Sequence, residues 1–468
     1  MHPLLAKHLL LVAERLRGER VDRFLPEMEE AQWKTPKQIQ GLQQARLEQL
    51  LRFTVTKNPY YREKYGGVDP VLEFNQLPLL TKDELRTSAR EMITPERRAR
   101  VRGCKTSGST GEPLKFYRDG VMFGRTLAAA YRAQRWYGLD VGSPMAMLWG
   151  IPTGRWDRFQ MRIRDYALNR FREEEYNLSP EVLSAFFKKM QRRKPSFIFG
   201  YSSMLYEFAL FCRERELDVA SLGLKAAICT AESIAPHQRE VMSAVFQAPV
   251  VSEYGAAEVG IVSYQCPKGN HHVSDDTVLL ELLDDDGGTV EEGEIGRVVV
   301  TALFSHAAPI IRYDLGDLAV RKRGSCPCGV GLSLLDRIVG RTSGVIVTPS
   351  GRCFHSIVIY YIMKDFAEAY GGVKQFRVRQ RRLDLLEVQL VTEEGFSGEA
   401  REWLGTTLRD TFGESVRVKL SLEDELTRMP SGKLSDFQSD LNSEELLLRS
   451  YRNLSVSAAT PPKLEGDR

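Results

Sequence analysis

A loop of hydroxyl-bearing and glycine residues is the part of this sequence best suited to hold a phosphate group. It contains Thr106, Ser107, Gly108, Ser109, Thr110 and Gly111. Glycine allows tight backbone turns, so backbone N–H and side-chain O–H groups can surround phosphate oxygens. The loop is not a Walker motif, because no Lys-Ser/Thr pair follows its second glycine, and it lacks the GxGxxG spacing of a dinucleotide turn. A flexible surface loop has the same composition, so its interpretation depends on the motifs that accompany it.

Four later motifs carry residues that can bind a nucleotide or its metal ion. They are Glu253-Tyr254-Gly255-Ala256-Ala257-Glu258, Arg312-Tyr313-Asp314-Leu315-Gly316-Asp317, Gly340-Arg341 and Pro430-Ser431-Gly432-Lys433. The first two follow apolar runs that are typical of buried strands. Each motif is weak by itself, because a lone glutamate is usually at the surface and Pro-Ser-Gly-Lys is also the composition of an ordinary turn.

In this order and at these separations, the motifs resemble those of the adenylate-forming superfamily, which includes acyl-CoA synthetases. The resemblance is strongest to the phenylacetate–CoA ligase family and its CapK-like branch. The N-terminal sequence of that branch is similar to Asn58-Pro59-Tyr60-Tyr61-Arg62 and Leu77-Pro78-Leu79-Leu80-Thr81-Lys82. The resemblance covers roughly residues 40–440. It implies an α/β fold, with a large layered αβαβα N-terminal domain followed by a smaller α+β C-terminal domain.

The same resemblance implies catalytic roles for three parts of the chain. The loop from Thr106 to Gly111 would hold the β- and γ-phosphates of ATP, and Glu258 would bind Mg²⁺. Lys433 would bring a positive charge to the acyl-phosphate oxygens. These roles suit the reaction, because attack of a carboxylate on the α-phosphorus builds negative charge that cations and N–H donors stabilise.

Six further residues would bind the nucleoside. Tyr254 would lie beside adenine, Asp317 would accept hydrogen bonds from the ribose hydroxyls, and Arg341 would support the ribose or a phosphate. The remaining three would lie along the nucleotide: Ala231, Glu232 and Gly255.

The implied activity is ATP-dependent conversion of a carboxylic acid to acyl-AMP with release of pyrophosphate, followed by acyl transfer to CoA. Ser343 and Gly344 stand where relatives often have an acidic hinge residue, and the sequence VTPSGRCF replaces a stretch that borders the pantetheine tunnel of CoA ligases. Other acceptors therefore stay open: an amine of a sugar or small molecule, a carrier thiol, or a hydroxyl that takes AMP. A binding module without turnover is a further alternative. The sequence does not identify the acid.

Three cysteines and a histidine have the composition of a structural zinc site. Cys266 lies shortly before His271 and His272, and Cys326 and Cys328 follow about 60 residues later. Three thiols and one imidazole complete a closed tetrahedral site. Some members of the family resembled carry cysteine and histidine at these places and bind zinc there, and His272 matches their pattern better than His271. The alternative is free cysteines in loops beside a solvated histidine pair.

Composition restricts the class of protein. The 468 residues are 43% apolar and 27% charged, with a net charge of +3, so neither wholesale disorder nor nucleic-acid binding is indicated. Seven cysteines do not suggest a disulfide framework. Neither a signal peptide nor a run of about 18 apolar residues is present, so we expect a cytoplasmic protein without a membrane span. The oligomeric state stays open, a homodimer included.

The order of elements predicts how these residues are positioned. Apolar runs at 144–152, 195–201, 225–231 and 248–255 alternate with helical segments at 180–192 and 203–215. This alternation is typical of a largely parallel sheet covered by helices. Residues 278–348 resemble antiparallel hairpins packed on that domain. A small α+β unit then follows: a helix at 356–369, strands near 374–391, a helix at 397–412 and a strand at 416–422.

The N-terminal residues keep helical periodicity to about residue 57. Leu9, Val12 and Leu16 fall on a plausible apolar face, and we expect breaks at Pro26 and Pro36. The domain boundaries that we predict are 1–60 for a helical N-terminal part of the large domain, 61–340 for the adenylation domain, 341–448 for a mobile C-terminal domain and 449–468 for a disordered tail.

Overall fold

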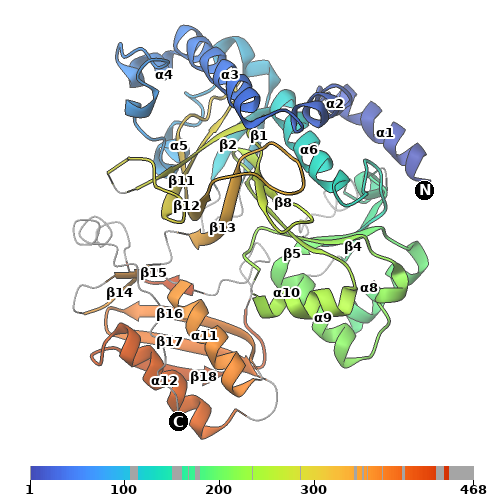
Figure 1. The fold of residues 1–468 in the computed structure, drawn as a ribbon, viewed down its shortest axis with the longest axis vertical. Helices are drawn as coiled ribbons and strands as arrows, with labels where there is room; N and C mark the ends of the chain where they lie inside the picture. The colour runs from blue at the N-terminus through green and yellow to red at the C-terminus, as the bar shows by residue number, and fades with distance from the viewer. Residues whose placement is uncertain are drawn as a thin grey trace. The chain divides into compact units, whose positions relative to one another are not determined.

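The computed structural model divides the chain into two compact units (Figure 1). It describes residues 2–105, 114–149, 161–166, 168–173, 180–234, 236–284, 286–341, 345–349, 353–355, 357–371, 373–392, 396–427 and 437–441. The first unit contains the described residues up to Arg341, and the second contains those from Val345 onward. In the described part of the chain, no helix is both long and apolar enough to cross a membrane.

Four helices open the first unit: α1 (Pro3–Leu16), α2 (Val21–Ala31), α3 (Pro36–Lys57) and α4 (Pro59–Tyr65). Helix α3 begins where the sequence predicted, because Thr35 and Gln38 form a capping box ahead of Pro36. The predicted break at Pro26 is wrong, since this residue lies inside α2. Phe24, Leu25 and Met28 of α2 pack in a buried cluster with α6, and this burial stabilises the helix despite the missing N–H.

The predicted apolar face of α1 is also wrong. Leu9, Val12 and Leu16 are exposed, and the buried face consists of Ala6, Leu10 and Glu14 instead. Because α1 has apolar residues on more than one side, its periodicity does not determine which side packs against the protein.

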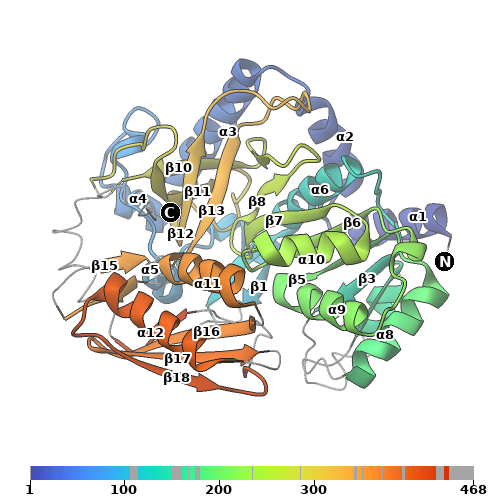
Figure 2. The same ribbon diagram turned by 60° about the horizontal axis from the view of Figure 1, so that its bottom comes forward.

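Five parallel strands form one half of the main sheet: β3 (Met145–Leu148), β4 (Arg170–Glu173), β5 (Phe197–Tyr201), β6 (Ala226–Thr230) and β7 (Val250–Ala256). Figure 2 shows α8 (Pro180–Arg193), α9 (Ser202–Glu214) and α10 (Pro236–Phe246) along one face of these strands. Helix α6 (Gly120–Arg135) packs on the other face through Ala133. The predicted strand–helix alternation is therefore confirmed.

Antiparallel strands complete the sheet: β8 (Gly260–Gln265), β9 (His271–Val273), β10 (Val278–Leu283), β11 (Ile295–Ala302), β12 (Tyr313–Lys322) and β13 (Leu334–Arg341). The hairpins expected beyond residue 278 are present, but they do not form a separate sheet packed on the parallel strands. They join the same eleven-stranded sheet, because Leu334 and Leu335 of β13 pair with His272 and His271 of β9. Sequence pattern identifies hairpins, but it does not reveal which strand edges pair.

Short elements complete the first unit. A separate two-stranded ribbon consists of β1 (Val101–Lys105) and β2 (Lys115–Asp119). Helix α5 (Lys82–Ser88) and the 3₁₀ turns Phe74–Gln76, Pro95–Arg100 and Ala220–Leu222 also belong to this unit.

The second unit is a small α+β structure with its own core. Its elements are β14 (Val345–Val347), β15 (Cys353–His355), α11 (Ile357–Tyr370), β16 (Val373–Arg382), β17 (Leu385–Thr392), α12 (Gly398–Phe412), β18 (Arg417–Leu422) and β19 (Phe437–Ser439). The strand order is β18-β17-β16-β19, and Phe366, Val388 and Leu404 are fully buried between this sheet and the two helices. The predicted fold class, a large α/β unit with a smaller α+β one, is confirmed.

Candidate nucleotide and metal sites

Two tyrosine–carboxylate contacts connect the end of β7 to β12. The hydroxyl of Tyr254 donates a hydrogen bond of 2.9 Å to Oδ2 of Asp317. The hydroxyl of Tyr313 donates one of 3.3 Å to Oε1 of Glu258, whose side chain is buried. Burial raises the pKa of Tyr313 well above its usual value, so this hydroxyl stays a donor. The fold thus brings together three residues that the sequence assigned to nucleotide and Mg²⁺ binding: Tyr254, Glu258 and Asp317.

Gly255 allows β7 and β8 to approach each other closely beside this pair of contacts. A Cβ at this position would lie 2.4 Å from the carbonyl oxygen of Gly260 on the neighbouring strand. Such a distance excludes any side chain, so another residue here would push the two strands apart. The glycine therefore positions Tyr254 and the turn that leads to Glu258.

Arg118 of β2 holds the turn between β7 and β8. Its Nη1 donates a hydrogen bond of 3.0 Å to the carbonyl oxygen of Ala257, and its Nη2 donates one of 3.0 Å to that of Met122. Burial lowers the pKa of Arg118 to about 10, so the guanidinium remains charged at neutral pH. Arg118 and Glu258 line one small pocket together. The positive charge thus lies beside the carboxylate expected to bind Mg²⁺.

The predicted pair Ala231 and Glu232 follows the carboxyl end of β6. Ala231 has a φ of 67°, in the left-handed region that residues other than glycine rarely adopt. Oε2 of Glu232 accepts a hydrogen bond of 2.8 Å from the backbone N–H of Ser203 in the first turn of α9. The carbonyl oxygen of Glu232 accepts one of 2.9 Å from Oγ of Ser202. The N-terminus of α9 therefore fixes this segment at the edge of the sheet where ligands of α/β folds bind.

Arg312 anchors the beginning of β12 to the segment that contains Leu77 and Leu80. Its guanidinium forms a buried ion pair of 2.9 Å with Glu281 and donates to the carbonyl oxygen of Leu77 at 2.6 Å. The carbonyl oxygen of Arg312 accepts a hydrogen bond of 2.9 Å from the N–H of Leu80. Two motifs on which the resemblance depends are thus in direct contact, and Arg312 positions the strand that carries Asp317.

Some predicted site residues lie outside the described residues or are described only in part. The loop Thr106–Gly111 and Lys433 lie outside them. The strands that flank the loop place Lys105 opposite Lys115. Arg341 is the last residue of β13, and its backbone is paired in register with Asp317. The expected ribose-binding positions are therefore neighbours on adjacent strands.

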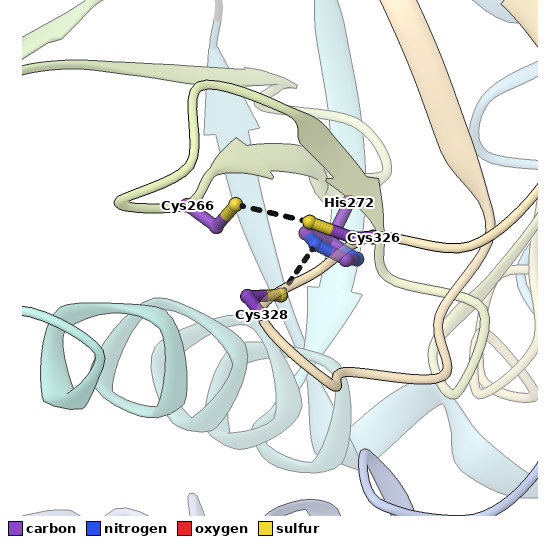
Figure 3. A group of neighbouring side chains, drawn as sticks. All are labelled: Cys266, His272, Cys326 and Cys328. Atoms are coloured by element: carbon purple, nitrogen blue, oxygen red, sulfur yellow. Dashed lines mark hydrogen bonds between the residues drawn. The ribbon is translucent and has the colours of Figure 1, made fainter.

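Cys266, His272, Cys326 and Cys328 form one compact cluster, and Figure 3 shows their side chains directed at a common point. Their ligand atoms all lie within 4.8 Å of one another. The two Sγ atoms of Cys266 and Cys326 are 3.6 Å apart, and Sγ of Cys328 lies 3.2 Å from Nε2 of His272. A tetrahedral site with Zn–S bonds of about 2.3 Å would place two sulfurs about 3.8 Å apart. The cluster therefore has the dimensions of such a site.

Surrounding groups prepare these side chains to bind a metal. Nδ1 of His272 lies 3.3 Å from the carbonyl oxygen of Leu332, which fixes the ring with Nε2 toward the sulfurs. Burial lowers the pKa of His272 to about 4, so the imidazole is neutral, as a ligand must be. A tight turn closed by the 2.9 Å hydrogen bond from Cys266 N to Asn270 O directs the first sulfur inward. His271 instead contacts Oγ of Ser263.

Sequence reasoning missed two residues that position Glu258. Tyr313 stands inside the motif from Arg312 to Asp317, so its place in that motif was the available signal. Arg118 lies in an unremarkable strand, and its contact with Ala257 joins positions 139 residues apart. The sequence around Arg118 does not indicate such a long-range contact.

Curated relatives cover most of the chain. CapK of Staphylococcus aureus is 21% identical over 404 residues, which span 84% of this chain and 87% of that protein. Phenylacetate–coenzyme A ligase of Thermus thermophilus is 24% identical over 455 residues, which span 85% of this chain and 95% of that protein. The Escherichia coli protein of the same name is 24% identical over 388 residues, or 76% and 83% of the two chains. No family model matches the chain.

Solved structures share the fold. A 2-hydroxyisobutyryl-CoA ligase in its post-adenylation state, in complex with 2-HIB-AMP, superposes with a TM-score of 0.68 at 18% identity, over 88% of this chain and 91% of the other. The same ligase in its thioesterification state, with 2-HIB-AMP and CoA, gives 0.57 at 18% identity, over 90% and 93% of the two chains. At these identities the likeness establishes the fold.

Proposed function

We propose that the chain is a member of the phenylacetate–CoA ligase family, in its CapK-like branch, and that it activates a carboxylic acid as acyl-AMP and then transfers the acyl group to CoA. The observation that carries this proposal is the convergence of Tyr254, Glu258 and Asp317 at the end of β7 and on β12. Relatives named phenylacetate–CoA ligase and a similar fold solved with an acyl-AMP support the same reaction.

In the first half-reaction an oxygen of the substrate carboxylate attacks the α-phosphorus of ATP, and the bond to the β,γ-pyrophosphate breaks. Asp317 would accept hydrogen bonds from the ribose, and its carboxylate accepts a hydrogen bond of 2.9 Å from Tyr254. Lys433 and the loop Thr106–Gly111 would stabilise the negative charge that accumulates on the phosphates. Acyl-AMP and pyrophosphate are the products, so every atom of ATP is accounted for.

Glu258 is the residue that would hold Mg²⁺ in this site. Its carboxylate accepts a hydrogen bond from Tyr313, and it lines a small pocket together with Arg118. Mg²⁺ prefers carboxylate oxygens and phosphate oxygens as ligands. When bound, the ion would neutralise negative charge on the phosphates.

The cysteine–histidine cluster would hold a structural Zn²⁺. Its four protein ligands would complete a tetrahedral site for the ion and leave no position for a substrate. Burial raises the pKa of Cys328 to about 12, so a bound cation is what would keep this sulfur as a thiolate. The zinc would connect the β8–β9 hairpin to the loop between β12 and β13.

We propose that the protein is cytoplasmic. ATP and CoA, the proposed co-substrates, are available there.

The decisive experiment is a carboxylate-dependent exchange of labelled pyrophosphate into ATP, run across a library of acids without an acceptor. Exchange that depends on one class of acid supports acyl-AMP formation and identifies that class. Addition of CoA should then release free AMP and form a thioester. AMP retained in the product would indicate nucleotidyl transfer to a hydroxyl instead. Absence of exchange with every acid tested would contradict the proposal and favour a binding module.

A further inference from the structure

We propose that helix α1 docks this protein onto an anionic lipid surface. The helix presents a set of exposed apolar side chains, which we call the α1 apolar face: Leu4, Leu5, Leu9, Val12 and Leu16. Their exposed fractions are 68%, 54%, 47%, 56% and 84% in that order. Single exposed leucines are common on protein surfaces, but a group of five on one short helix indicates an interaction site.

The geometry of the helix gathers most of this face into a narrow strip. At 100° per residue, Leu5, Leu9, Val12 and Leu16 fall within an arc of roughly 60°. The buried side chains Ala6, Leu10 and Glu14 lie on the other side of the helix. The exposed strip is therefore distinct from the face that packs against the protein.

The opposite side of α1 is firmly attached, so the exposure does not come from a loose helix. Leu10 is buried in a cluster with Phe24 of α2. Nζ of Lys7 forms an ion pair of 2.6 Å with Asp140. The backbone approaches Gly142 so closely that a Cβ there would lie 2.6 Å from the N atom of Lys7. A partner would thus meet a preformed apolar strip.

The charged groups beside the strip decide which partner fits. His8 and Arg15 are exposed on α1, and Arg17 is exposed directly after it. Glu14 is the only carboxylate in the helix sequence, and it is 1% exposed, on the packed side. The accessible side of α1 is therefore apolar and basic.

A lipid surface with anionic headgroups complements both properties. Apolar side chains of an amphipathic helix enter the boundary between headgroups and acyl chains, while arginines contact the phosphates. A second copy of this chain is a poorer partner, because facing strips would bring arginines together without carboxylates from α1 to pair with them. At 14 residues, α1 is about 21 Å long, which suits a helix lying in the plane of the interface.

Vesicle flotation tests this proposal with the full-length protein. Vesicles of phosphatidylcholine alone are compared with vesicles that also contain phosphatidylserine. We expect the protein to float with the anionic vesicles only, and added salt to release it. The variant Leu9→Glu/Leu16→Glu should no longer float. Arg15→Gln/Arg17→Gln should weaken binding roughly 30-fold, as expected for two surface arginines.

A matched control uses exposed apolar residues elsewhere on the same unit. Val68 and Leu72 are 39% and 83% exposed, and Val68→Glu/Leu72→Glu should float like the wild type. Thermal melts and pyrophosphate exchange of all variants should equal those of the wild type, which separates this proposal from the catalytic one. Three results would overturn it: no flotation with anionic vesicles, equal flotation of Leu9→Glu/Leu16→Glu, or a concentration-dependent dimer in sedimentation that this variant abolishes.

Discussion

The cysteine–histidine cluster and the residues proposed to bind the nucleotide are assembled in opposite ways. The cluster takes its four ligands from two short segments at the edge of the antiparallel strands, and their ligand atoms lie within 4.8 Å of one another. The residues proposed to bind the nucleotide come from the ends of β6, β7 and β13 and from β12, and the same site is expected to include a loop near residue 108 and Lys433. A closed arrangement suits stability, whereas an open one with separate contributors suits substrate exchange. Substitutions in the two regions should therefore change different measurable quantities.

The largest effect is expected for Lys433→Ala. Loss of a positive charge that stabilises the transition state should reduce pyrophosphate exchange about 10²-fold or more, with an unchanged melting temperature. Transfer of the acyl group from preformed acyl-AMP should fall far less, because Lys433 is expected to act only in adenylate formation. An equal loss in both half-reactions, measured by single-turnover kinetics, would contradict this division of labour. A lower melting temperature would contradict the contrast between the two regions.

The strands that position both regions were predictable from the sequence where both of their faces are buried. The apolar runs at 195–201 and 225–231 become β5 and β6, because strands covered on both faces are apolar throughout. Helix α1 shows the limit of this reasoning. Its leucines occupy several sides, and only tertiary packing selects Leu10 for burial and leaves Leu9 exposed.

In the candidate sites, only the residues that belong to recognisable motifs were predictable from the sequence. Motif order indicated Tyr254, Glu258 and Asp317, which the structure joins through the contacts of Tyr254 and Tyr313. Arg118 was not predictable, because its hydrogen bond to Ala257 depends on how β2 lies against the β7–β8 turn. The pairing of β13 with β9, which brings Leu334 beside His272, is likewise a tertiary property.

The next largest effect is expected in the cluster. Cys328→Ser should remove about one zinc per chain and lower the free energy of unfolding by about 2–3 kcal/mol, because structural zinc binding is coupled to folding. Metal analysis and thermal melts measure both quantities, and pyrophosphate exchange at low temperature should be nearly unchanged. Cys104→Ser is the control, since Cys104 is a half-buried thiol outside the cluster. Wild-type protein that is purified without chelator and contains no zinc would exclude the metal site.

A smaller, pH-dependent effect is expected at Glu253, which precedes Tyr254 on β7. Burial raises the pKa of this carboxyl to about 7, against a hydrogen bond with Thr230 that lowers it. A raised folded-state pKa means that the folded protein holds its proton more tightly. The contribution of protonated Glu253 to the free energy of unfolding is fully present below the unfolded-state pKa of 4.5, and it is lost as the pH rises through about 7.

Glu253→Gln should remove this dependence. The variant should match the wild type near pH 4.5 and be more stable by about 1–2 kcal/mol at pH 8, a figure reduced because the side chain keeps some access to solvent. Denaturant unfolding without nucleotide, repeated across this pH range, measures the difference. A difference in unfolding free energy that does not change with pH would show that the pKa of Glu253 is the same in the folded and unfolded protein, which would contradict this prediction.

The smallest effects come from a matched pair of tyrosines, one in each region. The hydroxyl of Tyr254 donates to Asp317 at 2.9 Å, and the hydroxyl of Tyr137 donates at 2.7 Å to the carbonyl oxygen of Gln265, the residue before Cys266. Each phenylalanine variant removes one hydrogen bond, worth about 1 kcal/mol.

Tyr254→Phe should raise the KM for ATP about 3- to 10-fold with little change in kcat or melting temperature, because Asp317 loses the contact that orients it toward ribose. Tyr137→Phe should lower the melting temperature slightly and leave the KM for ATP unchanged, because its partner Gln265 belongs to the β8–β9 hairpin that carries Cys266. If Tyr254→Phe instead lowered the KM for ATP, its hydroxyl would be competing with ribose for Asp317, and if both variants changed stability alone, Tyr254 would belong with the structural residues.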